Sequence, residues 1–430
     1  MNRIPLLWLP LLISAARADD WPQFRGPNRD SSWNEAGILE TFPADGLKVR
    51  WRTPIGGGFS SPVVAEGRVY VTDSKLEPPT AHEGIHCFEE TTGKPLWRHL
   101  FDGSYPDWAF EERNKLGPVA TPVVYDGKIY ALGWIGCLFC LDAANGNVLW
   151  QKKLAKEYPR KELACNASPL IDGELLIVCI GANPGACLVG FNKDNGNEVW
   201  KALDEPPTHS SPIIITAGGV RQLIVWTQGA ITSLEPATGK TLWRHRISAG
   251  ADYAVATPVC RDDLLLISGF MLRLDTAKPA ASMLWPGNGR ILSNTSTPLL
   301  IGDQLYSAKS SGEFVCMEAA TGKQVWVTDK VTDRNSGASV HLTSNGDSVL
   351  LFTNQGVLIR ARLTPQGYEE LSRVHLIEPT FPFGGRKVTW APPAFANRHV
   401  FARNGKELIC ASLAADEGCG SQLGGQSQPH

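Results

Sequence analysis

A short phrase recurs along this chain and constrains its fold more than any other feature of the sequence. The phrase is a small residue, usually followed by Pro, and then an apolar run. It begins eight times, at intervals of roughly 40 to 60 residues, a period typical of architectures whose units must stack to bury a core. The starts are Ser61, Thr121, Ser168, Ser211, Thr257, Thr297, a degenerate Ser339, and Ala391.

A second phrase closes most of these repeats. An acidic residue or Asn is followed by Gly and then by an apolar residue and Trp. A tight hairpin needs a residue at positive φ, which Gly adopts without steric cost. We expect each Trp to pack between neighbouring repeats. The clear copies end at Trp97, Trp150, Trp200, Trp243 and Trp326, and the Asp275 to Trp285 copy lacks the Gly.

The segments between the two phrases alternate in the way that strands do. Val69-Tyr70-Val71 and Leu305-Tyr306-Ser307 are examples. Each repeat therefore holds about four short strands, and such repeats form propellers. The eighth repeat has no closing Trp strand, but Lys48 to Arg52 has that pattern. The sequence predicts an all-β, eight-bladed β-propeller with four-stranded antiparallel blades, whose last blade is closed by this N-terminal strand.

The N-terminal residues have a pattern that predicts export. Residues 1–18 have the pattern of a signal peptide, with Arg3, an apolar run too short for a transmembrane segment, and an Ala16-Arg17-Ala18 cleavage site. We expect cleavage near Ala18 and a periplasmic or secreted protein. The remainder divides into an N-terminal extension (19–47), the single propeller (48–413) and a Gly-, Ser- and Gln-rich tail (414–430) that we expect to be disordered.

The composition narrows the classes of partner. The chain of 430 residues is 43% hydrophobic, and its formal charge of -2 becomes -4 without Arg3 and Arg17. No long basic block is present, which argues against nucleic-acid binding. We expect a monomer. The ten cysteines could form disulfides in an exported protein, but Cys87, Cys140, Cys316 and Cys410 share one repeat position and are better explained as small core residues; the pairing of the others stays open.

Several matches to known motifs are better explained by the repeat. His82-Glu83-Gly84-Ile85-His86 fits H-E-x-x-H, but the repeat places it on a strand, where residues four apart are about 13 Å apart and cannot share one Zn²⁺. Cys137 and Cys140 form a C-x-x-C on a strand, where they face opposite ways. Gly56-Gly57-Gly58 precedes a strand and is interpreted as a flexible blade entry. We therefore predict no metal site.

The repeats resemble those of the pyrroloquinoline-quinone (PQQ) repeat family. The resemblance rests on Leu141 to Trp150, on Glu235 to Trp243 and on the opening Trp21 to Arg29. It implies one of two activities. Quinoprotein dehydrogenases bind PQQ and Ca²⁺ in the central funnel and oxidise alcohols or sugars, whereas BamB-type proteins bind no quinone and scaffold the assembly of outer-membrane barrels. The adjacent Cys-Cys pair of the alcohol dehydrogenases and the lipid-anchor Cys of BamB-type proteins are both missing here.

Residues near the starts of the inner strands form the candidate site. In a propeller they converge on one mouth of the central channel and could bind a ligand there, or could simply cap strands and hydrate the channel. No catalytic constellation can be assembled from the sequence. The candidates are Arg113, Asn166, His209, Tyr253, Asn294 and Trp390.

These observations favour an exported, non-catalytic binding or scaffold propeller resembling BamB. It would take a protein partner or a small ligand at its funnel face, with no cofactor expected. The alternative is a PQQ- and Ca²⁺-dependent quinoprotein dehydrogenase acting on alcohols or sugars. A third reading, a carbohydrate- or polymer-binding propeller, rests only on exposed aromatic residues.

Overall fold

The computed structural model describes residues 20–103, 105–111, 117–158, 166–247, 254–286, 292, 295–335 and 337–415. The predicted signal peptide and residues 416–430 of the predicted tail lie outside this range. So do three of the predicted site residues, Arg113, Tyr253 and Asn294.

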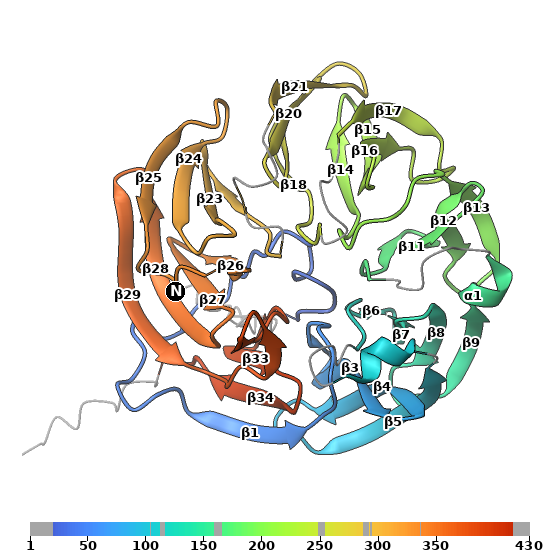
Figure 1. The fold of residues 1–430 in the computed structure, drawn as a ribbon, viewed down its shortest axis with the longest axis horizontal. Helices are drawn as coiled ribbons and strands as arrows, with labels where there is room; N and C mark the ends of the chain where they lie inside the picture. The colour runs from blue at the N-terminus through green and yellow to red at the C-terminus, as the bar shows by residue number, and fades with distance from the viewer. Residues whose placement is uncertain are drawn as a thin grey trace, which may run out of the picture.

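Strands of the described residues form eight four-stranded antiparallel sheets, arranged as blades around a central axis (Figure 1). The strands of each blade are given from the axis outward. Blade 1 consists of β2 (Val63–Ala65), β3 (Arg68–Glu77), β4 (Thr80–Glu89) and β5 (Pro95–Gly103), and blade 2 of β6 (Val123–Tyr125), β7 (Lys128–Leu132), β8 (Cys137–Asp142) and β9 (Val148–Lys153). Blade 3 consists of β10 (Leu170–Asp172), β11 (Leu175–Ala182), β12 (Ala186–Asn192) and β13 (Glu198–Ala202), and blade 4 of β14 (Ile213–Ala217), β15 (Val220–Trp226), β16 (Ala230–Leu234) and β17 (Thr241–Arg246). Blades 5 to 8 are β18 (Val259–Arg261), β19 (Leu264–Ile267), β20 (Phe270–Leu274), β21 (Ala281–Trp285); β22 (Leu299–Ile301), β23 (Gln304–Ala308), β24 (Phe314–Glu318), β25 (Gln324–Thr328); β26 (Val340–Asn345), β27 (Ser348–Thr353), β28 (Val357–Thr364), β29 (Gly367–His375); and β32 (Ala394–Ala396), β33 (His399–Arg403), β34 (Glu407–Ser412), β1 (Val49–Pro54).

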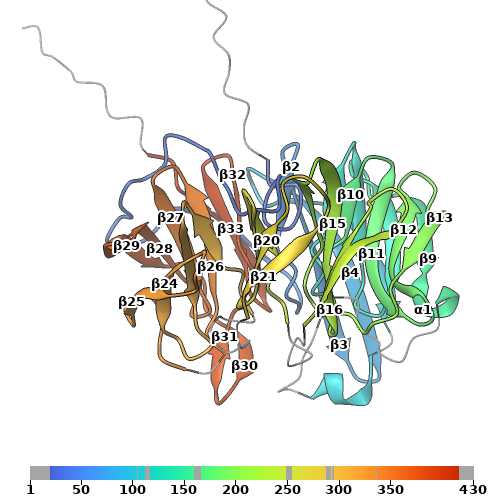
Figure 2. The same ribbon diagram turned by 90° about the horizontal axis from the view of Figure 1, so that it is seen from above.

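Three short elements lie outside the blades. A hairpin of β30 (Phe381–Phe383) and β31 (Arg386–Val388) projects from one face of the disc (Figure 2). The other two are a 3₁₀ turn, η1 (Asp107–Phe110), and a one-turn helix, α1 (Leu154–Glu157). Within the described residues, no helix is long and apolar enough to cross a membrane.

The last blade is closed by the N-terminal strand, as predicted. β1 pairs with β34 over Val49 to Pro54, with Trp51 opposite Cys410. The first strand of the chain is therefore the outermost strand of the eighth blade, and the ring is joined by backbone hydrogen bonds between the two ends of the chain. This pairing leaves the eighth blade with the same four strands as the others.

The hydrophobic core lies between the blades. One cluster joins Tyr130 and Cys140 of blade 2 to Phe191 of blade 3, and the next joins Leu188 of blade 3 to Val225 of blade 4. Each sheet thus buries both faces against its neighbours. The repeat-position cysteines are part of this core, because Cys87, Cys140, Cys316 and Cys410 are each 2% exposed or less and form no disulfide. The described Cys179, Cys187 and Cys260 form no disulfide either.

The outer-strand tryptophans seal the seams between blades, as predicted. In six seams the indole N–H donates to a backbone carbonyl of the next blade at 2.7 to 3.0 Å. These pairs are Trp51–Glu90, Trp97–Ala143, Trp150–Lys193, Trp200–Pro236, Trp285–Ala319 and Trp326–Thr364. The turn glycine of the next blade lies under the ring: a Cβ on Gly146 would come 2.5 Å from Trp97. The glycine is needed for close approach as well as for its φ of +76°.

The seam between blades 4 and 5 departs from this pattern. The closing turn of blade 5, which follows Asp275, has no glycine, and Trp243 donates its indole N–H at 2.7 Å to Gln222 of its own blade. His245 takes over the bridging role, with its Nε2 2.8 Å from the carbonyl oxygen of Ala281 in blade 5. The missing turn glycine therefore coincides with a changed seam.

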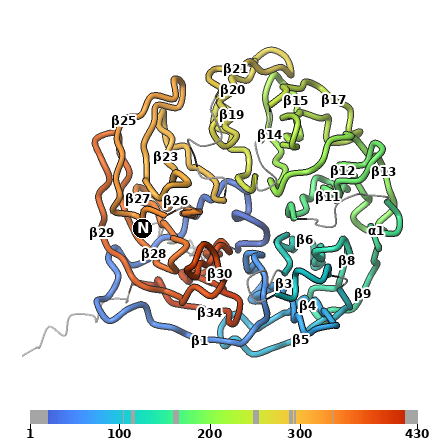
Figure 3. The backbone as a smooth tube through the Cα atoms, viewed as in Figure 1, coloured from blue at the N-terminus to red at the C-terminus, as the bar shows by residue number. Residues whose placement is uncertain are grey.

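The N-terminal extension crosses the channel (blue in Figure 3). Trp21 pairs with Val64 of blade 1, the carbonyl of Pro22 accepts the N–H of Val124 in blade 2, and Trp33 donates its N–H to Ser344 of blade 7, all at 2.8 to 2.9 Å. The repeats did not predict this brace. The Gly56-Gly57-Gly58 run, interpreted from sequence as a flexible entry, is packed closely: a Cβ on Gly56 would lie 2.3 Å from the carbonyl oxygen of Ser74.

The seam geometry predicts unequal costs for two glycine substitutions. Gly127 and Gly146 both have positive φ, +68° and +76°, but the space around a Cβ is open only at Gly127. We expect Gly127→Ala to cost about 1 kcal/mol from backbone strain. We expect Gly146→Ala to cost about 2 kcal/mol more, because the methyl group displaces Trp97. Denaturant unfolding of the two variants checks this, and equal losses would contradict the proposed packing role of the glycine.

Candidate functional site

A central funnel opens at the end of the channel where the inner strands begin. Its volume is about 770 Å³. Its floor is the N-terminal extension, which contributes Trp21, Phe24, Arg25 and Ser31. Because the extension crosses the axis, the cavity is a funnel closed at its base by this chain's own backbone.

One position of the repeat supplies the rim of the funnel from every blade. In seven repeats it lies two residues before the small residue that begins the recurring phrase, and in the eighth it lies one residue before Ala391. The eight residues are Phe59, Val119, Asn166, His209, Val255, Thr295, Gly337 and Trp390. Of the candidates predicted from sequence, Asn166, His209 and Trp390 occupy this position and line the funnel, and their binding role stays a prediction. In blade 5 the lining residue is Val255, two residues after the predicted Tyr253, and in blade 6 it is Thr295, one residue after the predicted Asn294.

A chain of hydroxyl contacts holds neighbouring rim segments in register. The backbone N–H of Ser61 donates to Thr121 Oγ1, that of Thr121 to Ser168 Oγ, and that of Ser168 to Ser211 Oγ, at 2.9 to 3.0 Å. The N–H of Thr257 donates to Thr297 Oγ1 at 3.0 Å in the same way, whereas the hydroxyls of Thr257 and Ser339 are buried without a partner among the described residues. The preference for Ser or Thr in the phrase is thus explained by this contact in four of the repeats.

One wall of the funnel is a cluster of four aromatic rings. Phe381 and Phe383 of the β30–β31 hairpin pack on Trp390 with centroid distances of 5.4 and 4.8 Å. Phe59 of blade 1 contacts Phe381 edge-to-face at 4.9 Å. The hairpin could not be predicted from the repeats, because it occurs once and shares no pattern with them.

A second aromatic wall is carried by η1 and the blade 2 turn. Tyr105 stacks on Trp134 at 4.7 Å with an interplanar angle of 7°, and Trp108 meets Trp134 edge-on at 6.2 Å. Trp108 is 48% exposed, so it presents an open aromatic surface. Trp108 and Trp134 both line the funnel.

Glu83 anchors this second wall from beneath. Its carboxyl is 1% exposed and accepts the Tyr105 hydroxyl at 3.0 Å and the Trp134 backbone N–H at 3.0 Å. Burial raises the pKa of Glu83 to about 7, with a further contribution from the charge of Asp73, although both hydrogen bonds oppose the shift. This buried carboxyl therefore joins β4 to the loop before η1 and to the turn after β7.

The other residues of the H-E-x-x-H match also have structural partners. The motif lies in strand β4, as predicted. His86 Nε2 lies 2.7 Å from Asp73 Oδ1, and His82 Nδ1 lies 2.9 Å from Asp102 Oδ1. His82 and His86 thus pair with different carboxylates on the neighbouring strands. Among the described residues, no group of three or more His, Cys, Asp or Glu side chains could hold a metal ion.

Two histidines with hydrogen-bond partners line the funnel. Asn166 Nδ2 donates to His209 Nε2 at 3.0 Å, and His341 Nε2 donates to the carbonyl of Trp390 at 2.9 Å. Burial lowers the pKa of His341 to about 4; the charge of Arg25 acts in the same direction, against the opposing effect of the Trp390 hydrogen bond. His341 is consequently uncharged at neutral pH.

The floor contains two buried guanidinium groups. Arg25 donates to Ser31 Oγ, to the carbonyl of Arg29 and to the carbonyl of Asp30, and Arg29 donates to the carbonyls of Pro169 and Ser168. Burial lowers the pKa of Arg25 to about 10 and that of Arg29 to about 9. Neither group forms an ion pair with a described carboxylate, although the charge of Asp30 raises the pKa of Arg25 and so offsets part of the positive charge of the floor.

The described lining does not suit a Ca²⁺-bound quinone. Ca²⁺ is normally held by several oxygen ligands, mostly carboxylates. The described lining residues include no Asp or Glu, and Asn166 is the sole side-chain amide among them. The Asn166 Oδ1 atom is buried without a partner and could supply one ligand, which is too few for this ion.

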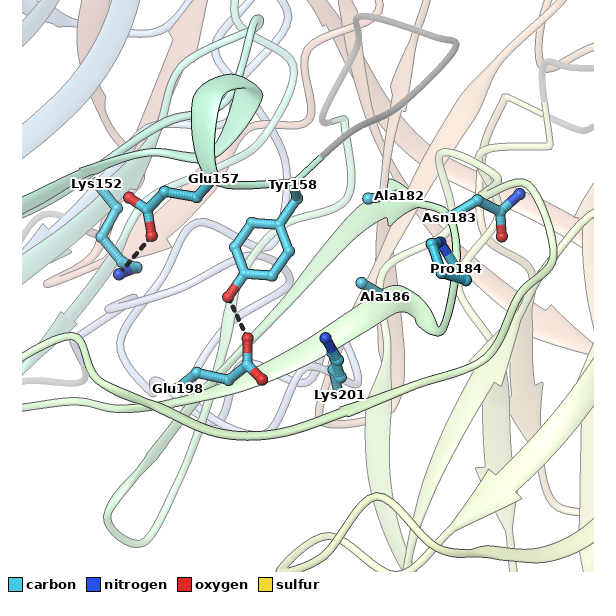
Figure 4. A pocket seen from close by; sticks show the side chains of 9 residues that line it. All are labelled: Lys152, Glu157, Tyr158, Ala182, Asn183, Pro184, Ala186, Glu198 and Lys201. Atoms are coloured by element: carbon cyan, nitrogen blue, oxygen red, sulfur yellow. Dashed lines mark hydrogen bonds and ion pairs between the residues drawn. The ribbon is translucent and has the colours of Figure 1, made fainter.

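A smaller pocket lies at the rim of the disc, between blades 2 and 3 (Figure 4). It has a volume of about 380 Å³ and is lined by Tyr158, Glu198 and Lys201, among others. The Tyr158 hydroxyl donates to Glu198, and Lys152 pairs with Glu157. Lys152 and Glu157 neutralise each other, and the pocket has about half the volume of the funnel, so the central funnel is the stronger candidate site.

The pKa of Glu83 predicts a pH-dependent stability. Its pKa is about 7 in the folded protein against an ordinary 4.5, so its contribution is fully present below pH 4.5 and is lost as pH rises through 7. We expect Glu83→Gln to remove on the order of 3 kcal/mol of this pH dependence and to melt above the wild type at pH 8. Glu198→Gln, at an exposed tyrosine-bonded Glu, is the control. Parallel melting profiles of Glu83→Gln and wild type from pH 5 to 8 would contradict the assignment.

Comparisons with known proteins agree with this architecture. The family model described as outer membrane protein assembly factor BamB matches residues 41–187 and 81–328. The chain is 21% identical over 346 residues to the outer membrane protein assembly factor BamB of Shewanella oneidensis, covering 75% of this chain and 74% of that protein. It is 23% identical over 205 residues to a quinohemoprotein alcohol dehydrogenase of Comamonas testosteroni, covering 46% of this chain and only 28% of the dehydrogenase.

Solved structures share the fold at low sequence identity. BamB from Moraxella catarrhalis superposes with a TM-score of 0.58 and 16% identity, covering 85% of this chain and 97% of that one. The quinohemoprotein alcohol dehydrogenase from Comamonas testosteroni superposes with a TM-score of 0.63 and 13% identity, covering 95% and 82%. Similarity at this level establishes the propeller alone. The matched ranges of the family model, which together span most of the propeller, show that the chain belongs to the family of the outer membrane protein assembly factor BamB.

Proposed function

We propose that this chain is an exported, non-catalytic binding propeller that acts as a scaffold in outer-membrane protein assembly. The funnel face is its binding surface, and the partner is a protein or a small ligand. Membership of the BamB family supports the scaffold role. The signal-peptide pattern of residues 1–18 supports export to the periplasm.

The lining of the funnel is the observation that carries the proposal. Two aromatic walls face a cavity whose described lining includes no carboxylate, and one of the walls ends in the exposed ring of Trp108. Concave apolar surfaces with a few polar groups are typical of binding sites. Proton transfer in catalysis needs a group whose pKa lies near the working pH, and His341, with a pKa of about 4, is a weak base.

The alternative is a quinoprotein dehydrogenase. It draws support from the relative in Comamonas testosteroni, although the match spans little more than a quarter of that enzyme. The funnel argues against it, because Asn166 is the one described lining side chain with an amide oxygen and no described carboxylate joins it. The dehydrogenase is therefore the second candidate.

A cofactor titration separates the two candidates. We expect PQQ with Ca²⁺ to leave the melting temperature of the mature protein unchanged, because the described lining offers too few oxygen ligands for the ion. Differential scanning calorimetry and quinone absorbance, each with and without Ca²⁺, make the measurement. Saturable binding with a rise in melting temperature would favour the dehydrogenase instead.

The scaffold role is tested in the cells that make this chain. We expect deletion of the gene to lower the amount of folded β-barrel proteins in the outer membrane, and the wild-type gene to restore it. Trp108→Ala should restore the barrels less well, because it removes an exposed ring of the funnel. Tyr125→Ala, at an aromatic residue of similar exposure (46%) outside the funnel, is the matched control. Unchanged barrel levels after deletion would refute the scaffold role.

A further inference from the structure

Two buried hydrogen-bond donors of the described funnel lining have no acceptor, against one buried acceptor, Asn166 Oδ1, that has no donor. The indole N–H groups of Trp21 and Trp390 are buried and have no acceptor among the described residues, and both residues line the cavity. Arg25 adds a positive charge at the floor, which the charge of the nearby Asp30 offsets in part. The described lining contains no Asp or Glu to balance these donors. A ligand that fits this surface supplies acceptors and negative charge.

Arg25 is the group best placed to receive that charge. Its side chain lines the cavity, and its residue is 6% exposed. Three of its N–H groups are used by Ser31 Oγ and the carbonyls of Arg29 and Asp30, which leaves two of its five N–H groups. Those three contacts hold the guanidinium rigidly. Asp30, the nearby acid, is occupied by hydrogen bonds to Ser32 N and Oγ.

Arg29 does not supply a second anion contact. Its Nη1 donates to the carbonyl of Pro169 at 2.7 Å and its Nη2 to that of Ser168 at 3.2 Å, so it faces blade 3 and is absent from the lining. Burial lowers the pKa of Arg29, and the neighbouring positive charge of Arg25 lowers it further. A single guanidinium facing the cavity matches a single carboxylate.

The walls specify the body of the ligand. Trp390, Phe381 and Phe383 form one aromatic wall, and Trp108 and Trp134 form the other. Aromatic rings bind planar aromatic ligands by stacking and edge contacts. His209 and His341 are held by Asn166 and by the Trp390 carbonyl, so the remaining sides of the funnel are polar.

We propose that the funnel binds a planar aromatic monocarboxylate, with its ring between the two aromatic walls and its carboxylate on the Arg25 guanidinium. This inference rests on the proposed binding role of the funnel and names the class of ligand. It differs from a metal-bound quinone, which needs several acidic or amide ligands for the ion. Here the protein supplies the positive charge itself.

The test compares two isosteric probes on the unaltered mature protein. The probes are 2-naphthoate and its neutral amide, 2-naphthamide, measured by isothermal titration calorimetry at pH 7.5. We expect the carboxylate to bind at least about tenfold more tightly than the amide, because a charge-assisted contact to a buried guanidinium is stronger than a neutral one. We also expect the advantage of the carboxylate to shrink as NaCl is raised.

Variants then locate the site. Trp108→Ala should weaken 2-naphthoate about fivefold through the lost ring contact, and Tyr125→Ala should leave it unchanged. Arg25→Met should abolish the preference for the carboxylate over the amide. Because Arg25 also holds the floor loop, the folded state of Arg25→Met is checked by its melting temperature, and the comparison of probes on the wild type stands without it.

Each outcome bears on the inference. A preference for 2-naphthoate that depends on Trp108 and not on Tyr125 supports it. Equal binding of both probes overturns the assignment of an anion but leaves a binding funnel. Binding of neither probe overturns the ligand class, whereas the outer-membrane experiment with the deleted gene decides the scaffold role independently.

Discussion

The packing of five outer tryptophans on the glycine turn of the next blade is the contact on which the rest of the propeller depends. A four-stranded sheet cannot bury both faces alone, so stability comes from the seams. At a seam such as Trp97 over Gly146, one ring fills the gap that the absent side chain leaves and donates its N–H to Ala143. Because this contact sets how neighbouring blades meet, it also sets where their inner strands begin, and so the shape of the funnel.

The two ends of the chain complete what the repeats begin. β1 joins the ring through β34, and the preceding extension crosses the axis to touch blades 1, 2, 3 and 7. The same extension that braces the channel also places Arg25 at its floor. Positive φ at Arg25, Gly26, Arg29 and Ser31 shows that the loop is tightly wound, and the guanidinium of Arg25 holds it by bonding the carbonyls of the loop. The Arg25 side chain therefore both holds the loop together and lines the proposed binding site.

The repeats could be predicted from sequence because each signal occurs several times and has a local cause. The turn glycines, the closing tryptophans and the missing strand of the eighth blade all follow from that pattern. The site was only partly predictable. Asn166, His209 and Trp390 line the funnel, but in blade 5 it is Val255, two residues beyond the predicted Tyr253, that does so. The aromatic walls and the floor arise from insertions that occur once, so no repeat could indicate that Phe383 or Trp108 would face the cavity.

Because binding proteins and dehydrogenases share this fold, the function of each member depends on the residues that its insertions add to the funnel. Here the additions are aromatic rings and a guanidinium, and the described lining includes no carboxylate. The one buried carboxyl close to the site, Glu83, is directed to Tyr105 and to the Trp134 backbone, where it supports a wall from behind. Glu83 thus serves the structure, and the cavity keeps the positive charge of Arg25, which forms no ion pair with a described carboxylate although Asp30 lies nearby. Since burying a charge without an ion pair is costly, a floor of this kind is favoured where a ligand pairs with it.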